Sequence, residues 1–492
     1  MIDSGKKHLP TAGFFIAQDG QEVFGDLRLR GRNTTLHLNL KSELPHKIEL
    51  AAIHGALFDR RKVSCLQCIL LSAVNGRLGT TEQYHHADMF PHFVTVGRRH
   101  LAEDEASITA VHFSTQDLHL IFDDFQAYGH ILASKEAIES LVKGGDYPRS
   151  VEFGEDPQAF YFSGKYEVVA IETEIGLLRV SHQPTSNIGG GTGIYIKDKL
   201  VLTLKFEQPV VLGQCIERVM SIHRFLSLVA GRKQSIESLS LSLADDPVHQ
   251  HSPLELYWMH APKGSTSKAE KPHPGDLPVD AVRRSTEFKS VLVNWLKREP
   301  TWRTARIRYA GCASKRNSYS ADRLVAAANM FDILPADATP SKSELPAELA
   351  KAKQECREIF RRLVPGIERN GILRDLGRMG APSLTKKVLY HADLVNDKLA
   401  SRFPDLSQAA VTAVKCRNFF VHGSEDFDYP RFESLTPFLT DVLEFIFAAS
   451  DLISAGWDAE AWGNRHYSAG HSFTRFRWGY KEHIALLKQA LS

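Results

Sequence analysis

The sequence lacks an uninterrupted hydrophobic run long enough to span a membrane. Its longest apolar stretch, residues 442–453, is broken by Glu444 and Asp451, whereas a membrane helix needs about 20 consecutive, largely apolar residues. No apolar segment follows the two lysines within residues 1–7, which argues against a secretory signal. We therefore expect a cytoplasmic protein that does not associate with membranes.

Cysteine is also scarce, and the pattern of the six cysteines predicts neither a disulfide framework nor a zinc site. The only close pair, Cys65 and Cys68, has no second pair or histidine cluster beside it to complete four ligands. A metal site at His85, His86 and His92 is a weaker alternative, because the segment before the third histidine is expected to be a loop. We expect no metal and no other cofactor.

The chain has no large excess of charge of either sign, but its charges are unevenly distributed. Its 60 Lys and Arg against 58 Asp and Glu give a net charge of +2. Residues 101–160 hold three basic against twelve acidic residues, or −9, and residues 301–400 hold eighteen against eleven, or +7. The basic segment fits a polyanionic partner such as RNA, although many basic helical faces are simply solvated.

The first half of the chain reads as strands. Apolar and polar residues alternate in segments such as 35–40, 62–69 and 200–206, which predicts a β-rich, sandwich-like domain. A helix from Gly213 to Gly231 should close this domain. We therefore predict a β-rich domain at residues 1–260 and a linker rich in Pro, Gly, Lys and Ser at residues 261–280.

The second half, residues 281–492, has helical periodicity almost throughout and predicts an all-α domain. No period of 20 to 50 residues repeats, so a solenoid is not expected. The expected helices lie at residues 284–298, 321–334, 344–363, 385–399, 406–422, 432–453 and 481–491.

The helix expected at residues 406–422 ends in an arginine and a histidine that suit RNA chemistry. Arg417 is always charged and offers a planar fork to phosphate, while His422 can take or give a proton near neutral pH. Lys415, Asn418 and His422 share one helical face, and Arg417, about 140° from His422, must reach around the helix. Gly423 should end the helix there.

A purely structural interpretation is the common one for an isolated pair of this kind: Arg417 would bind a carboxylate and His422 the helix end. The neighbouring segments favour a catalytic role for Arg417 and His422 over this structural one. The run from Arg417 to Gly423 resembles the Arg-x4–6-His signature of HEPN-domain ribonucleases, in which a polar residue, often Asn, follows the arginine. The apolar helices at residues 321–332 and 432–453 resemble the core helices before and after that signature.

The resemblance can be narrowed to ApeA-like bacterial anti-phage proteins. The second half is similar to their HEPN domain, and the first half to their β-rich domain in residues 13–15, 24–27 and 53–55. One departure concerns the early helix, where related domains often carry a glutamate. This chain has Asn329 there, with Asp332 one turn later.

The resemblance implies a metal-independent endoribonuclease of phage defence by abortive infection, with transfer RNA as one candidate target. His422 would transfer the proton, and Arg417 would position the phosphate and stabilise its charge. Asn418 would orient the histidine or the scissile phosphate. Lys415 and Asp332 are tentative RNA-binding residues. The products would be a 2′,3′-cyclic phosphate and a 5′-hydroxyl.

The resemblance also implies a homodimer or higher homo-oligomer with facing motifs, and a β-rich domain that senses a phage-derived trigger. The helix expected at residues 432–453 has a larger apolar surface than one buried helical face needs, because it carries Phe438, Val442, Phe445 and Ile446. This favours pairing with a second copy over the alternative that these side chains only fill the core of the monomer. The alternative function is a non-catalytic HEPN module that binds RNA, nucleotides or a protein.

A last feature is the aromatic and arginine-rich segment at residues 457–480. Its side chains could stack on RNA bases, but a packed C-terminal cap is the more common arrangement.

Overall fold

The computed structural model divides the chain into two compact units. The β unit comprises residues 1–223, 234–265 and 280–285, and the helical unit comprises residues 224–233, 266–279 and 286–492. The segment predicted as a linker contributes to both, so the domain limits at residues 260 and 281 stay a prediction. The described residues are 12–16, 20–40, 51–78, 82–144, 152–187, 193, 195–244, 253–268, 270–342, 344–423 and 427–492.

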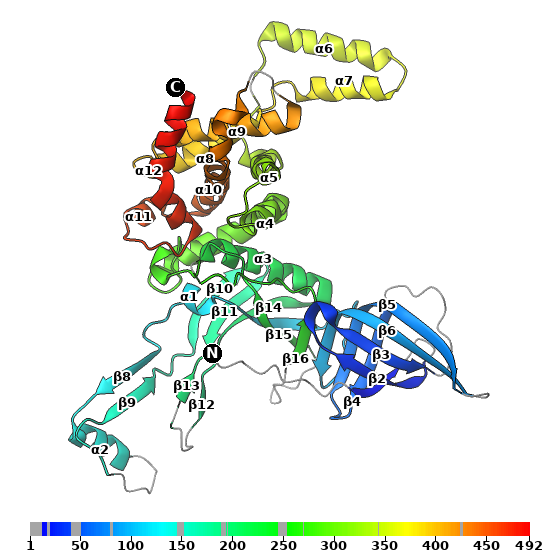
Figure 1. Ribbon diagram of the computed structural model, residues 1–492, viewed down its shortest axis with the longest axis vertical. Helices are drawn as coiled ribbons and strands as arrows, with labels where there is room; N and C mark the ends of the chain where they lie inside the picture. The colour runs from blue at the N-terminus through cyan, green and yellow to red at the C-terminus, as the bar shows by residue number, and fades with distance from the viewer. Residues whose placement is uncertain are drawn as a thin grey trace. The chain divides into compact units, whose positions relative to one another are not determined.

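Six antiparallel strands of the β unit close into a barrel (Figure 1). They run in the order β6-β3-β2-β1-β4-β5, and β5 pairs back onto β6, so that no edge is left open within this ring. Alternate residues point inward and form a core that includes Phe15, Leu38 and Val94. The strands are β1 (Ala12–Ile16), β2 (Glu22–Arg28), β3 (Thr35–Leu40), β4 (Ala51–Leu57), β5 (Lys62–Leu78) and β6 (Glu82–Gly97).

Two glycines make room for the central aromatic ring of this barrel. Phe15 is fully buried, and a Cβ at Gly25 or Gly55 would lie 2.7 or 2.5 Å from its ring carbons. Real Cβ atoms do not approach that closely, so any larger residue would displace the ring. The short segments around Phe15, Gly25 and Gly55 carried the resemblance to the β-rich domain. Packing in the core of the barrel explains these residues.

The barrel continues into an open sheet through β6, which pairs with β3 near its start and with β16 near its end. From β16 the strand order is β15-β7-β14-β11-β10, all antiparallel. The strands are β7 (Ile108–Thr115), β10 (Glu167–Thr173), β11 (Gly176–His182), β14 (Leu200–Val210), β15 (Ile236–Leu243) and β16 (Leu254–Trp258). The prediction of a β-rich domain is confirmed, and its strands form one continuous sheet, closed at one end, in place of two facing sheets.

The β unit also carries two small hairpins, and the predicted helix lies in the chain between its strands β14 and β15, so that β15 and β16 follow the helix that was expected to close the domain. The helix α3 spans Leu212–Ala230, and Gly231 after it has a left-handed φ of 66°, which confirms both predicted ends. The hairpins pair β8 (Tyr128–Leu132) with β9 (Gln158–Phe162) and β12 (Thr185–Asn187) with β13 (Tyr195–Lys197), and two short helices are α1 (Leu118–Ile121) and α2 (Lys135–Lys143).

The helical unit is built around α10, which is buried along most of its length and packs against α5, α8 and α9. Phe438, Val442, Phe445 and Ile446 are all buried in this core, so the argument that they form a pairing surface is wrong. The helices are α4 (Ser285–Ala313), α5 (Ala321–Asp332), α6 (Ala347–Arg362), α7 (Ile367–Arg378), α8 (Leu384–Leu399), α9 (Leu406–His422), α10 (Thr436–Ala455), α11 (Ala459–Gly463) and α12 (Ser472–Leu491).

The aromatic segment before and within α12 is a packed cap. Trp457, Trp462, Phe473 and Tyr480 are buried, so the structural alternative is confirmed for them. Trp478 remains 70% exposed.

Among the described residues, no helix combines the length and the apolar character needed to cross a membrane. The signal-peptide argument rested on residues 1–7, which lie outside the described residues.

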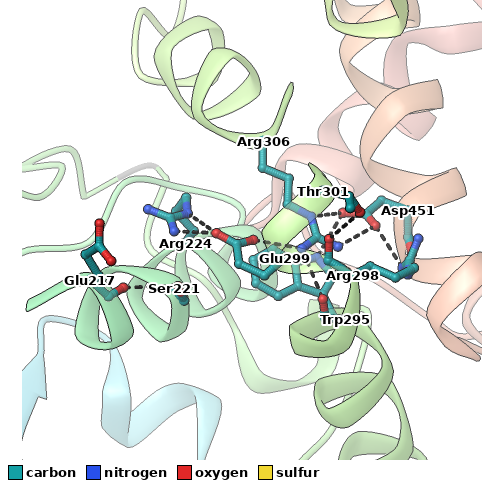
Figure 2. A network of polar contacts seen from close by, with 9 residues as sticks. All are labelled: Glu217, Ser221, Arg224, Trp295, Arg298, Glu299, Thr301, Arg306 and Asp451. Carbon is teal, nitrogen blue, oxygen red and sulfur yellow. Dashed lines mark hydrogen bonds and ion pairs between the residues drawn. The ribbon is translucent and has the colours of Figure 1, made fainter. Parts of the chain in front are cut away.

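A buried network of charges ties α4 to α10 (Figure 2). Asp451 accepts hydrogen bonds from Trp295 Nε1 and from Nε and Nη2 of Arg306, each at 2.9 Å, and forms an ion pair with Arg298. Arg306 also donates to Glu299 at 2.8 Å. Burial alone would raise the pKa of Asp451, but the two arginines hold it below its usual value.

The change Asp451→Asn should lower the free energy of unfolding by about 3–5 kcal/mol, because it removes the carboxylate that pairs with the largely buried Arg298 and one of the two carboxylates that pair with the buried Arg306. Urea unfolding followed by tryptophan fluorescence would measure this loss, since Trp295 lies in the network. The exposed Glu482→Gln on α12 is the control and should change stability by less than about 0.5 kcal/mol. Equal stability of the two variants would contradict the prediction.

Two buried histidines should make the helical unit sensitive to acid. Burial lowers the pKa of His391 and of His471 from 6.5 to about 4. Since the folded pKa lies below the unfolded one, the unfolded chain takes up each proton first as the pH falls. Stability is therefore complete above about pH 6.5 and is lost between there and pH 4, by on the order of 3 kcal/mol for each histidine.

Urea unfolding at pH 7 and at pH 4.5 would measure this loss. His391→Gln and His471→Gln should each flatten the pH dependence, whereas the exposed His466→Gln should leave it unchanged. An identical pH dependence in all three variants and the wild type would exclude the two buried histidines as its cause.

Candidate active site

The helix α9 places the arginine and histidine motif at its C-terminal end. It spans Leu406–His422, as predicted, and Gly423 follows with a left-handed φ of 63° and donates its N–H to the carbonyl of Phe419 at 3.0 Å. Glycine adopts this conformation without a steric penalty, so the helix stops at the residue before it. His422 is therefore exposed at a helix end, and Arg417 and Asn418 are half-buried one turn earlier.

Arg417 does reach around the helix to the histidine. Its Nη1 lies 3.2 Å from Nε2 of His422 and donates to Oδ1 of Asn418 at 3.1 Å. The structure thus brings together the three residues predicted as catalytic, although its geometry does not test their roles. Guanidinium N–H groups only donate, so Nε2 must be the acceptor and the ring proton lies on Nδ1 in this arrangement.

A fourth member of the cluster, Asn329, comes from α5. Its Oδ1 accepts from both Nε and Nη2 of Arg417, at 3.3 and 2.9 Å. Sequence reasoning noted this position only as the place of a missing glutamate, and did not assign it a role. The signal available was its place in the early core helix, but nothing local to residue 329 indicates a partner 88 residues further along the chain.

The two tentative RNA-binding residues lie outside this cluster. Asp332, at the end of α5, is exposed and forms an ion pair with Lys387 at 3.1 Å, so its carboxylate is already occupied. Lys415 is exposed on α9 and has no hydrogen bond or ion pair to the described part of the chain. The RNA-binding roles of Lys415 and Asp332 stay predictions.

Aromatic rings pack beside the motif. Tyr429 stacks on Phe419 with ring centroids 5.1 Å apart and meets Phe420 edge-on at 4.6 Å. This contact holds part of the segment that follows the motif; residues 424–426 of that segment lie outside the described residues. The rings fix the chain that leads away from His422.

Two apolar side chains next to the histidine face solvent. Phe420 is 37% exposed and Val421 is 44% exposed. The end of α9 extends beyond the core that covers Ala410 and Val414. An exposed apolar pair beside a polar site indicates a surface that a macromolecule can cover.

The alternative metal site is not assembled. His85 and His86 are neighbours on β6 and point to opposite faces of the sheet, while His92 stacks on His260 with centroids 5.1 Å apart. The loop expected at residues 89–91 is wrong, since these residues continue β6 and pair with β5. Within the described ranges, no three His, Cys, Asp or Glu side chains could hold a metal ion together.

The cluster of Arg417, Asn418, His422 and Asn329 combines a fixed positive charge with a proton acceptor. A guanidinium can hold the oxygens of a phosphate and stabilise added negative charge on them. The lone pair of His422 Nε2 can accept a proton from a hydroxyl group once the arginine releases it. These are two of the functions that cleavage of an RNA backbone by its own 2′-hydroxyl requires.

Comparisons with known families agree with the fold, a strand-rich part followed by a helical one. Residues 11–295 match the family model described as ApeA N-terminal domain 1, and residues 325–461 match the one described as Apea-like HEPN. The second match contains residues 325–332 of α5 and the whole of α9, and thus the four residues of the cluster. No curated protein and no solved structure matches the chain.

Proposed function

The chain belongs to the ApeA-like proteins with a C-terminal HEPN domain, and on this premise we propose that it is a metal-independent endoribonuclease. Its family is one of anti-phage defence with a HEPN module of the nuclease type. The observation that carries the finer proposal is the contact between Arg417 and His422, which puts a phosphate-binding cation and a proton acceptor 3.2 Å apart at an exposed helix end.

The proposed reaction uses the 2′-hydroxyl of RNA as the nucleophile. His422, neutral with a free lone pair on Nε2, takes the proton of that hydroxyl as general base. Arg417 binds the scissile phosphate and stabilises the charge that builds up on its oxygens, while Asn418 keeps the guanidinium oriented. The O2′–P bond forms as the P–O5′ bond breaks, which gives a 2′,3′-cyclic phosphate and a 5′-hydroxyl. Both tasks are done by side chains, so no metal is needed.

The leaving 5′-oxygen also needs a proton, and a second copy of the chain is the proposed source. One motif supplies one imidazole, whereas base and acid are both required. The exposed Phe420 and Val421 beside His422 offer an apolar surface on which two α9 ends could meet across a two-fold axis. Dilution tests this arrangement: specific activity should fall as the dimer dissociates, and a fully active monomer would exclude it.

The proposed biological role is abortive infection, in which cleavage of RNA, with transfer RNA as one candidate, stops phage growth at the cost of the cell. The β unit would sense a phage-derived trigger.

The second candidate function is a non-catalytic module that binds RNA or nucleotides. It would use the same arginine, but it has no task for the proton acceptor at His422.

Incubation of the purified protein with labelled RNA in EDTA separates the two functions. The enzyme should produce fragments with cyclic phosphate ends, which are resistant to phosphatase until acid opens them. Binding without cleavage, with and without added divalent ions and at concentrations that favour the dimer, would exclude the enzyme and favour the binding module.

A further inference from the structure

The helices α6 and α7 form a hairpin that we call the arm, and Figure 1 shows it projecting from the helical unit. Arg369 ties its two halves together, because its Nε and Nη2 donate to the carbonyls of Phe360 at 2.7 Å and of Arg361 at 2.9 Å. At the other end of the arm, Lys353 Nζ donates to the carbonyl of Met379 at 3.1 Å. The arm is therefore a defined element with both of its ends fixed.

The arm has no hydrophobic core of its own. Neither α6 nor α7 contains a buried residue, and helices of 16 and 12 residues are marginally stable in water without packing. Four aliphatic side chains around the turn, which we call the tip, face solvent: Ile359 is 58% exposed, Leu363 50%, Val364 85% and Ile367 88%. Such a cluster indicates a surface that another molecule covers.

The arm leaves the helical unit at the end that carries the motif. It follows α5, whose last residue, Asp332, lies one turn after Asn329, the residue bonded to Arg417. It returns to α8, where Lys387 donates to the carbonyl and to the carboxylate of Asp332, at 3.2 and 3.1 Å. Lys387 thus anchors the returning chain about one helical turn from the cluster.

The area of contact favours a second copy of the chain as the molecule that covers the tip. A standard protein interface buries about 800 Å² on each partner. The exposed parts of Phe420 and Val421, on which the two α9 ends are proposed to meet, amount to only on the order of 150 Å². The tip adds on the order of 500 Å² of aliphatic surface, on an element that leaves from the same end of the unit. The two surfaces together approach what a stable dimer needs.

RNA is the alternative occupant, because Arg361 and Arg362 at the end of α6 are exposed. Proteins that bind single strands offer aromatic rings on which bases stack. Residues 347–378 expose no such ring, since their one aromatic residue, Phe360, is half-buried. Arginine beside apolar side chains is also typical of protein interfaces, so the aliphatic tip favours a protein partner.

We propose that the arm binds a second copy of the chain and that the tip packs on the partner's helical unit. The arm leaves each unit at the end where the two motifs are proposed to face each other, so it reaches across the two-fold axis to the other copy. The inference rests on the proposed function for the pairing of the motifs. It adds the surface that holds the pair together.

The combined change Val364→Ser and Ile367→Ser should raise the dissociation constant of the dimer by at least about tenfold, because it removes the apolar contacts of the tip. Both side chains are more than four-fifths exposed, so the melting temperature of the dilute protein should stay the same. Sedimentation velocity over a series of concentrations measures the dissociation constant. Specific activity should fall at a correspondingly higher concentration, while kcat of the fully assembled enzyme is unchanged.

Two matched variants are the controls. The combined change Val364→Ile and Ile367→Val keeps the tip apolar and should dimerise as the wild type does. The combined change Ile307→Ser and Leu486→Ser removes two exposed aliphatic side chains of α4 and α12, outside the arm, and should also leave the dissociation constant unchanged.

A wild-type dissociation constant in the folded Val364→Ser, Ile367→Ser variant would overturn the proposal, and so would a wild type that is monomeric at all concentrations. A variant that stays dimeric but binds RNA more weakly would also overturn it, because the tip would then contact RNA. If the variant dissociates as expected but the wild-type dimer cleaves no RNA in EDTA, the proposed function fails and the role of the arm stands. If the variant dimerises normally and cleaves RNA, the role of the arm fails and the proposed function stands.

Discussion

The change His422→Ala should lower the rate of RNA cleavage by about 10²–10⁴-fold, which is the usual contribution of a general acid or base. The imidazole is the one group of the cluster with a basic lone pair that can accept a proton, because a guanidinium only donates hydrogen bonds and a carboxamide is not a base. The side chain is exposed at the end of α9, so its removal should change the melting temperature very little. Cleavage of labelled RNA in single-turnover conditions measures the effect.

The control for this variant is His466→Ala, which removes another exposed histidine of the helical unit and should leave cleavage unchanged. If the two variants cleave at the same rate while both remain folded, His422 does not transfer a proton. Mixing the two proteins tests the proposed dimer. A mixture of equal amounts of wild type and His422→Ala should be less active than its wild-type protein is by itself, because each mixed dimer lacks one imidazole.

The change Arg417→Lys should lower kcat by about 10²–10³-fold although it keeps the positive charge. The guanidinium bridges Asn329 on α5 and both Asn418 and His422 on α9, using three nitrogen atoms at once. The ammonium of lysine has its donors on a single nitrogen and cannot span these acceptors while it also grips a phosphate at two points. The loss should therefore appear in kcat more than in RNA affinity.

The same substitution at an exposed arginine, Arg374→Lys on α7, is the control and should cleave at the wild-type rate. RNA binding measured at several salt concentrations separates charge from geometry, because Arg417→Lys should keep a salt dependence close to that of the wild type. Full activity of Arg417→Lys would show that the charge alone is sufficient and would contradict a positioning role.

Local patterns in the sequence were enough to predict the features that depend on neighbouring residues. The limits of α9 and its end at Gly423 follow from helical periodicity and from the left-handed conformation that glycine permits. The approach of Arg417 to His422 depends only on their spacing of five residues and on the length of the arginine side chain. The alternation of polar and apolar residues likewise predicted the strands of the β unit.

Other helix limits differ because tertiary contacts outweigh local preference. The helix expected at residues 284–298 continues past Pro300 to Ala313 as α4. The buried ion pairs of Glu299 and Arg306 lie on both sides of the proline and hold the two segments in one line. The helix α7 was missed because Gly371 and Gly377 lower its helix propensity, and its packing against α6 compensates for that loss.

The sequence by itself determined that a β-rich part precedes a helical one, and that an arginine and a histidine meet at a helix end. Only the tertiary structure decided that the strands close into a barrel, that the phenylalanines of α10 fill a core, and that Asn329 holds Arg417. The reason is the range of the contacts. Periodicity and capping act over a few residues, whereas the pairing of β5 with β6 and β4, the burial of α10 and a hydrogen bond between α5 and α9 depend on which distant segments the folded chain brings together.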